Sequence, residues 1–310
     1  MKRLALIVIL ALAISAVSYG QVQSPDPKTL PVLPNVDITV LVDNMAGPVL
    51  GEWGLAYLIQ TGGHRILFDT GGGQTLFGNA EALEVDLGKI EAIVISHEHD
   101  DHTGGLAKTL DLCGPVDLFI HPAAFSTRYW KEDDRVETHA MSISREQLKT
   151  RVRALHETVK PEAVGAGLMV TGQVPRVTDF EDTGLAGVAF LDAETKEPDP
   201  VLDDQALFFR VPQGVVVVLG CAHAGVVNTI EYVSRLTGEK KIYAIIGGTH
   251  LIGASAERLQ KTIAAFRRFE IEKIMLSHCT GVNAFAELAK AFPGRCTWPG
   301  AGSRVQFGEE

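Results

Sequence analysis

Positive charge is scarce in this chain, and the shortage narrows the range of partners. Its 310 residues include 28 lysines and arginines against 38 aspartates and glutamates, a formal net charge of −10 at pH 7. Proteins that bind nucleic acid neutralise phosphates with Lys and Arg. The acidic balance therefore predicts no nucleic-acid partner, although it does not choose a substrate.

Cysteines are also few, and their positions favour free thiols. The four are Cys113, Cys221, Cys279 and Cys296. An exported protein could oxidise them. Because Cys221 and Cys279 stand close to histidines in apparent site loops, free thiols are expected there. A Cys113–Cys296 disulfide stays open, since the sequence does not test its geometry.

Two common catalytic motifs are missing. The sequence has no G-x-S-x-G elbow, so a serine nucleophile is not needed, and no P-loop that would cradle phosphates. It also has no internal repeat and no low-complexity tract. After the N-terminal segment, no apolar run is long enough to cross a membrane.

Residues 1–20 have the layout of a secretory signal peptide. Lys2 and Arg3 precede an apolar run, and small residues lead to a plausible cleavage site after Gly20. The run is shorter than the roughly 20 residues of a membrane span, which leaves an uncleaved anchor as the alternative. No cysteine follows it, so no lipid anchor is expected. We expect a periplasmic or secreted protein with no stable membrane insertion after cleavage.

The remaining chain is predicted to form one domain, residues 36–310, behind an extended, proline-rich leader at 21–35. A polar stretch at about 123–175 is interpreted as an insertion or lid. Apolar segments bounded by turn residues predict strands at 36–43, 54–61, 64–71, 90–97, 116–122, 206–211, 214–221, 241–248 and 272–279.

Helices are predicted from apolar spacing. Residues 145–159 place Leu148, Val152 and Leu155 on one face, and 255–269 form a second amphipathic helix. Asn283 is expected to cap a third. One more helix should follow the histidine cluster described next. Strands and helices in this order are compatible with two packed sheets and helices outside.

The stretch SHEHDDHTGG, at 96–105, carries the strongest chemical signal. His97, His99, Asp101 and His102 follow a buried strand and match H-x-H-x-D-H. Imidazole and carboxylate are the usual ligands of Zn²⁺ and related ions. Burying four such groups without a partner would be costly, and a pair of metal ions removes that cost. The alternative is a solvated polar loop.

This stretch resembles the signature of the metallo-β-lactamase superfamily. LFDTG at 67–71 is similar to the family's early Asp motif, and SHCTG at 277–281 to its last His motif. The resemblance extends over nearly the whole chain after the leader. It implies an α/β fold, an αβ/βα four-layer sandwich of the metallo-β-lactamase type, with a dinuclear metal site at one edge.

One branch of that superfamily is more similar still: archaeal dihydropterin-ribofuranosylaminobenzene phosphate synthases and related metal-dependent hydrolases. Its marks are DNMAG (43–47), EWGLAYLI (52–59), TGQVPRVTDFE (171–181), LGCAHAGVVNTIE (219–231) and GGTHL (247–251). The branch usually has a histidine in the second motif, where this chain has Trp53.

The resemblance also implies the ligands. Residues 171–181 contain no histidine, and Cys221 stands where a strand-ending Asp is expected. His223 is then the best candidate for the missing ligand, with a structural histidine as the alternative. The ligand set becomes His97, His99 and His223 on one ion, and Asp101, His102 and His278 on the other, with Asp69 orienting a histidine from behind.

Without a bridging Asp, a solvent ligand would hold the two ions together, and the second would bind more weakly. Cys221 either approaches the metals as a thiolate or packs below the site. The expected cofactors are two divalent metal ions. Zn²⁺ is the metal that the ligand set suits best, although Mn²⁺ or Fe would also fit.

Several other residues have weaker signals. His250 could contact substrate, donate a proton, bind metal or be a structural loop residue. Glu52 is either a carboxylate at the edge of the site or a solvated turn charge. Asp43 and Asn44 either support a substrate loop or merely make a turn. Surface positions are expected for His64, His139 and His156, whereas His121 could line the pocket.

Three functions remain open. The first is an exported metal-dependent hydrolase in which metal-activated hydroxide attacks an ester, lactone, amide or phosphoester of a small-molecule substrate, with Asp101 as the catalytic carboxylate holding both metal and hydroxide. The second is the synthase branch's own transferase reaction, although export argues against cytoplasmic pterin substrates. The third is a non-catalytic metal-bound binding or sensor protein. Substrate and oligomeric state are not predicted.

Overall fold

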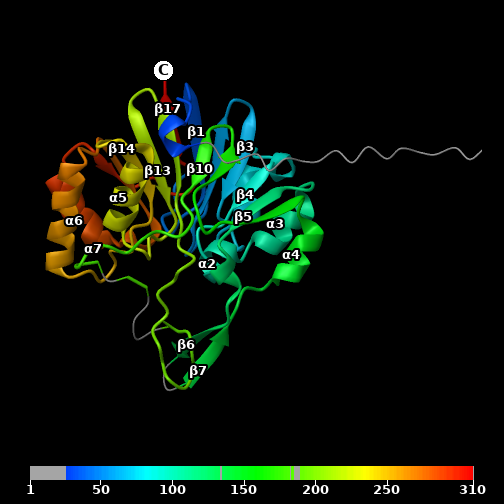
Figure 1. The fold of residues 1–310 in the computed structure, drawn as a ribbon. Coiled ribbons are helices and arrows are strands. Elements are labelled where there is room, and N and C mark those ends of the chain that lie inside the picture. Colours follow the sequence, from blue (N-terminus) through cyan, green and yellow to red (C-terminus); the bar gives the residue numbers. More distant parts are fainter. Residues whose placement is uncertain (1–25, 133–134, 182, 185–188, 310) are drawn as a thin grey trace, which may run out of the picture.

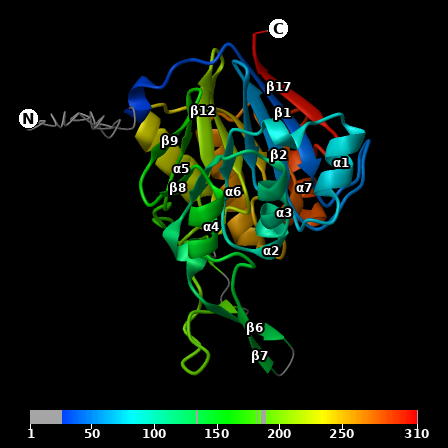
Figure 2. The ribbon, with the colours of Figure 1, turned by 90° about the vertical axis from the view of Figure 1, so that its right-hand side faces the viewer.

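Two mixed sheets packed face to face form the body of the protein (Figure 1). The computed structural model describes residues 26–132, 135–181, 183–184 and 189–309. Helices cover the outer face of each sheet, and a small third sheet projects from one end of the body (Figures 1 and 2).

The first sheet has seven strands in the order β17-β1-β2-β3-β4-β5-β8. From β3 onward the neighbours run parallel. In chain order the strands are β1 Asn35–Val42, β2 Ala56–Thr61, β3 His64–Phe68, β4 Ala92–Val94, β5 Asp117–Ile120, β8 Ala154–Glu157 and β17 Arg304–Gly308.

The second sheet also has seven strands, in the order β16-β15-β14-β13-β12-β10-β9. Its parallel part runs from β13 to β16. The strands are β9 Glu162–Gly165, β10 Leu168–Val170, β12 Leu207–Val211, β13 Gly214–Leu219, β14 Ile242–Gly247, β15 Lys273–Leu276 and β16 Cys296–Thr297.

Three apolar clusters separate the layers. Between the sheets, Phe68 and Phe119 meet Phe209 and Val216 of the opposite sheet. Outside the first sheet lie α1 Leu76–Ala82, α3 Leu106–Leu112 and α4 Arg145–Arg151. Outside the second lie α5 Val226–Thr237, α6 Ala256–Arg268 and α7 Val282–Ala291. Each sheet is buried on both faces, which explains the nearly continuous apolar strands, and the four-layer αβ/βα sandwich is confirmed.

The segment expected to form one insertion at 123–175 divides in two. β6 Arg128–Glu132 and β7 Arg135–His139 pair into a hairpin, and β11 Ala189–Phe190 joins them to make the projecting sheet (Figure 1). By contrast α4, β8, β9 and β10 belong to the main layers. The projecting part therefore combines two separate stretches of sequence.

The helix predicted over 145–159 was wrong in its second half. Helix α4 ends at Arg151, and Val152 is already extended, with φ −106° and ψ 158°. Residues 154–157 form β8, which pairs in parallel with β5. The apolar residues that suggested a helical face fit the layer between α4 and the sheet equally well. The expected cap of α7 was also misplaced, since Gly281 is the N-cap rather than Asn283.

The N-terminal part of the described chain packs against the domain. Leu30 and Leu33 of the predicted leader are buried, and the Leu33 N–H donates to the Arg210 carbonyl. The predicted signal peptide lies outside the described residues. Within the described residues, every helix is too short or too polar to span a bilayer.

One edge of the sandwich gathers the strand ends that matter for function. The parallel strands β3 and β4 of one sheet, and β13, β14 and β15 of the other, are followed there by the loops that contain the predicted site residues. Ligand sites in α/β proteins form at the carboxyl ends of parallel strands. The topology therefore brings residues far apart in sequence to one place.

Candidate metal centre

The histidine-rich loop starts just after β4 and closes into the short helix α2, Asp100–Thr103. His99 is the N-cap of this helix, and Asp101 lies in its first turn. The tight turn directs His102 back toward His97, so that all three imidazoles of the loop are buried.

The first group of candidate ligands is His97, His99 and His223. The Nε2 atom of His97 lies 2.9 Å from Nδ1 of His99. The His223 ring centroid is 4.8 Å from both other rings. Both ring nitrogens of His223 are buried with no hydrogen-bond partner among the described residues. Buried polar atoms are normally paired, so these nitrogens point to a ligand.

Electrostatics keep this group neutral. Burial lowers the pKa of His97 and of His223 well below the ordinary value, and neighbouring histidines lower both further. Burial also lowers the pKa of His99 to about 3. Neutral imidazole has a free lone pair, which is the form that binds a divalent cation.

The second group is Asp101, His102 and His278. Nε2 of His278 lies 3.2 Å from both the Asp101 carboxylate and Nε2 of His102. Burial raises the pKa of Asp101, but His102 and His278 outweigh it and hold that pKa below its usual range. The result is an anionic ligand beside two imidazoles.

Asp69 and Ser96 orient two of the histidines. The Asp69 carboxylate accepts hydrogen bonds from the Ser96 N–H, the Ser96 hydroxyl and Nδ1 of His102, each at 2.7 Å. Since the Ser96 hydroxyl donates to Asp69, it accepts from Nδ1 of His97, at 2.9 Å. Both histidines therefore carry their proton on Nδ1 and present Nε2 to the centre.

Asn44 and Asp43 do the same for His278. The Asn44 side-chain oxygen accepts from Nδ1 of His278 at 2.9 Å, and the Asp43 carboxylate accepts from its backbone N–H at 3.0 Å. Both residues follow β1, whose end reaches the same edge of the sandwich. They support a histidine rather than forming a bare turn. Sequence reasoning missed this contact, as it missed Ser96.

Cys221 and His250 extend the cluster. The Cys221 thiol is buried, with Sγ 3.2 Å from Nε2 of His102. Its sulfur and the ring nitrogens of His97 and His102 lie within 4.8 Å of one another, and so do the ligand atoms of Cys221, His223 and His250. The structure therefore places this thiol close enough to the candidate ligands to join either group.

Comparisons with known proteins agree with this geometry. The model of the metallo-beta-lactamase superfamily matches residues 54–278, more than half of the chain. The chain belongs to the metallo-beta-lactamase superfamily. This confirms the resemblance drawn from the H-x-H-x-D-H stretch and its companion motifs.

Three known proteins are similar to this chain over most of its length. It is 29% identical to 7,8-dihydropterin-6-methyl-4-(beta-D-ribofuranosyl)-aminobenzene-5'-phosphate synthase of Methanocaldococcus jannaschii, over 81% of this chain and 89% of the synthase. The crystal structure of a metal-dependent hydrolase of the beta-lactamase superfamily is 25% identical, with a TM-score of 0.72, over 87% of this chain and 98% of that one. A diphosphatase of the PhnP family shares the fold alone: 12% identity, TM-score 0.53, 89% of this chain and 98% of that one.

Four residues of this site have a strained backbone. Asp69, Ala222, His250 and His278 all have φ between 46° and 59°, the left-handed region that side chains other than glycine seldom adopt. Each lies in a loop just after a parallel strand. Such strain persists where surrounding contacts enforce it, and it is typical of functional sites.

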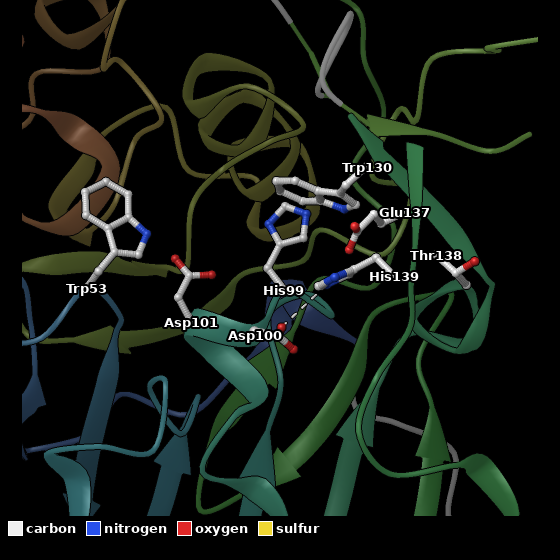
Figure 3. Close-up of a pocket in the computed structure, with 8 residues that line it drawn as sticks. All are labelled: Trp53, His99, Asp100, Asp101, Trp130, Glu137, Thr138 and His139. Atoms are coloured by element: carbon white, nitrogen blue, oxygen red, sulfur yellow. Dashed lines mark ion pairs between the residues drawn. The ribbon is translucent and has the colours of Figure 1, made fainter. Parts of the chain in front are cut away.

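A cavity of about 370 Å³ opens over the centre (Figure 3). His99 and Asp101 form its floor, Trp53 stands on one side, and Trp130 and His139 stand on the other (Figure 3). Trp53 stands where the resemblance to the synthase branch implied a histidine, and its ring centroid is 5.1 Å from that of His278. The cavity is therefore lined by residues of both the metal-ligand loop and the projecting sheet.

A buried charge cluster attaches the projecting sheet to the histidine loop. Arg128, at the start of β6, binds the carboxylates of Asp199 and Asp203, and its Nε lies 3.4 Å from Glu98. Asp203 also accepts from the Glu98 N–H at 2.8 Å. Burial raises the pKa of Glu98 to about 8 despite the nearby guanidinium.

Glu52 lies away from the cavity lining. Its carboxylate accepts from the Thr75 N–H at 2.7 Å, just before α1. Its other oxygen is buried and lies 2.7 Å from where a Cβ atom on Gly71 would be, so only glycine fits beside it. These contacts support the loop after β3, and contact of Glu52 with substrate stays a prediction.

The remaining histidines divide between confirmed and wrong predictions. His64 is exposed and pairs with Glu91, as expected. His139 was expected at the surface but lines the cavity. His156 lies in β8 rather than on a helix and stacks on Phe119. His121 is buried and caps a short turn through the Ala123 N–H, with no place in the cavity lining described above.

All four cysteines are free thiols. The Cys113 thiol donates to the Leu87 carbonyl beside the helices of the first sheet, whereas Cys296 lies in β16 of the second. The disulfide left open by the sequence is therefore not formed.

Proposed function

We propose that the chain is an exported metal-dependent hydrolase of small-molecule esters, lactones, amides or phosphoesters. One observation carries the proposal: the six proposed ligands come from three separated loops and lie in two groups of closely spaced ligand atoms, and His99 and Asp101 line one cavity. The 25% identity to a metal-dependent hydrolase of the same superfamily supports it.

We propose two divalent metal ions as cofactors. Zn²⁺ is the preferred identity, and Mn²⁺ or Fe is the alternative. The donor set suits them because the first group offers neutral imidazoles and the second adds a carboxylate. His97, His99 and His223 would hold one ion; Asp101, His102 and His278 would hold the other. When bound, such ions lower the pKa of water and polarise a substrate oxygen.

The protein's own groups would supply the positioning. Asp101 is partly exposed at the cavity floor and is the carboxylate proposed to orient the attacking water (Figure 3). Asp69, Ser96 and Asn44 fix the imidazoles, so little reorganisation is needed. The two tryptophans restrict solvent around the substrate.

Metal analysis of the purified protein tests the site. The parent should retain close to two equivalents of metal, and His99→Ala should lose a large share of it. His64→Ala, a matched substitution at an exposed histidine, should change nothing. A full metal load in His99→Ala would contradict the assignment.

A substrate panel tests the reaction. Esters, lactones and phosphodiesters are assayed with and without chelator, and turnover that chelation abolishes is the expected result. Metal retained without turnover of any member would favour the alternative, a non-catalytic metal-bound binding or sensor protein.

A transferase reaction is the second candidate function. The 29% identity to the synthase of Methanocaldococcus jannaschii, across 81% of this chain, favours it. Incubation with a pterin diphosphate and an aminobenzene ribofuranosyl phosphate tests it, since formation of the joined product would replace hydrolysis as the conclusion.

We propose export on the basis of residues 1–20 alone, namely the basic start, the apolar run and the small residues before Gln21. Expression of the full chain in a bacterium, followed by fractionation and N-terminal sequencing, tests it. A periplasmic protein that begins at Gln21 is expected, whereas an intact N-terminus on a cytoplasmic protein would contradict it.

A further inference from the structure

Three consecutive polar residues form the loop that leads into β12 and are almost completely buried. Asp203, Asp204 and Gln205 are 0%, 2% and 1% exposed. Asp and Gln are mostly exposed in proteins, so burial of three in a row requires bonded partners. Strand β12 belongs to the second sheet, yet the segment 203–205 contacts the loops that follow strands of both sheets.

Toward the first sheet, the segment holds the backbone on both sides of the first histidine in the metal-ligand loop. The Gln205 N–H donates to the Ser96 carbonyl at 3.0 Å, and the Gln205 side-chain amide donates to the Ile95 carbonyl at 2.8 Å. Beyond that histidine, the Asp203 carboxylate accepts from the Glu98 N–H at 2.8 Å. The main chain of the loop is therefore bonded to the segment at three points.

Toward the second sheet, Asp204 holds the loop that carries His223. Its carboxylate accepts from the Ala224 N–H at 2.9 Å and also from the backbone N–H of His223. Burial raises the pKa of Asp204 to about 7. An oxygen of the carboxyl group accepts in either protonation state, so this contact does not depend on titration.

The turn before the segment is itself closely bonded. Val201 has a φ of 51°, and its N–H donates to the Asp199 carboxylate at 2.7 Å. The Arg176 guanidinium donates to the carbonyls of Pro200 and Val201, at 2.6 and 2.7 Å. The Asp204 N–H then closes the turn on the Val201 carbonyl at 3.2 Å. These bonds give the segment a fixed place relative to both loops.

The first group of candidate ligands depends on that place, because its members come from opposite sheets. His97 and His99 follow β4, whereas His223 follows β13. We propose that Asp204 is a positioning residue of the first metal site, and that the segment 203–205 sets the spacing between His223 and the other two histidines. This inference rests on the metal site of the proposed function.

The test measures each proposed ion separately. In His278→Ala the ion of the first group should remain, and in His223→Ala the ion of the second. Dissociation constants for Zn²⁺ are determined by competition with a chromophoric chelator. Adding Asp204→Ala should raise the Kd about 10- to 100-fold in the His278→Ala background, and less than about threefold in the His223→Ala background.

Two further substitutions control the experiment. Asp43 is the matched residue of the second group, since its buried carboxylate accepts from the His278 N–H at 3.0 Å. Asp43→Ala should therefore weaken the ion that remains in His223→Ala. Asp204→Asn keeps an acceptor oxygen and should hold Zn²⁺ within about threefold of its background, as expected when an outer residue acts through a hydrogen bond.

Folding is checked by circular dichroism, and Asp204→Leu fills the same space if Asp204→Ala does not fold. An unchanged Kd in the His278→Ala background, or equal weakening in both backgrounds, would overturn the assignment and leave the proposed function standing. A parent that binds Zn²⁺ but hydrolyses nothing would remove the proposed function and leave this inference standing. A parent that binds no Zn²⁺ would remove both.

Discussion

Single residues organise the centre by fixing which nitrogen each histidine keeps free. Ser96 and Asp69 hold the Nδ1 protons of His97 and His102, and Asn44 holds that of His278. Each Nε2 then points toward the other ligands. These hydrogen bonds define tautomers before any metal arrives, which is how outer residues raise metal affinity.

Cys221 is the residue whose role the structure changes most. Its Sγ lies 3.2 Å from Nε2 of His102, at the position where the superfamily resemblance expects a carboxylate. We expect a cobalt-substituted parent to show strong near-ultraviolet thiolate-to-cobalt absorption, because a coordinating thiol is deprotonated. Cys221→Ser should lose this absorption and weaken binding of the second equivalent of metal.

Cys113→Ser is the control for that experiment. This thiol donates to the Leu87 carbonyl and lies in none of the candidate ligand groups of the described residues. It should keep the absorption. A spectrum that survives Cys221→Ser unchanged would return Cys221 to a packing role.

Whole strands and helices were predictable to different degrees. The central strands of both main sheets were evident because burial on two faces leaves continuous apolar runs such as 242–247. The strands β8, β9, β10, β16 and β17 were not predicted. The H-x-H-x-D-H loop was evident because its ligands are adjacent in sequence. Asn44 and Trp130 were not, because their partners lie far away along the chain. The hairpin at 128–139 has no apolar alternation to reveal it.

Attachment of the projecting sheet depends on one buried cation. Arg128 is fully buried against three carboxylates, so Arg128→Met leaves those charges without a partner. We expect the free energy of unfolding to fall by about 3–5 kcal/mol in urea titration, with faster proteolysis in the hairpin. The neutral aliphatic side chain retains the packing of the arginine stem.

Arg151→Met provides the comparison for this variant. Its partner Asp111 is largely exposed, so the loss should be at most about 1 kcal/mol. Similar losses in the two variants would show that the buried cluster contributes no more than a surface pair, and the hairpin would need another anchor.

The candidate metal ligands lie at the edge of the sandwich where the loops of the two main sheets meet. The loop at 97–102 belongs to the first sheet, whereas His223 and His278 follow strands of the second. Ions held by both sets of ligands would therefore link the two halves of the sandwich, and would bind the folded chain far better than the unfolded one.

Removal of metal should accordingly lower the stability of the entire domain. Ligand at 100 times its Kd contributes about 2.7 kcal/mol, which for a chain of this size corresponds to a fall in Tm of roughly 5–10 °C on chelation. Differential scanning calorimetry of the parent with and without chelator measures it. His99→Ala should start from the lower Tm and respond little to chelator, whereas His64→Ala should follow the parent. Since the ligands come from both sheets, the transition should shift as one peak; a shift confined to part of the transition, or an undiminished response in His99→Ala, would mean that the metal does not link the two halves.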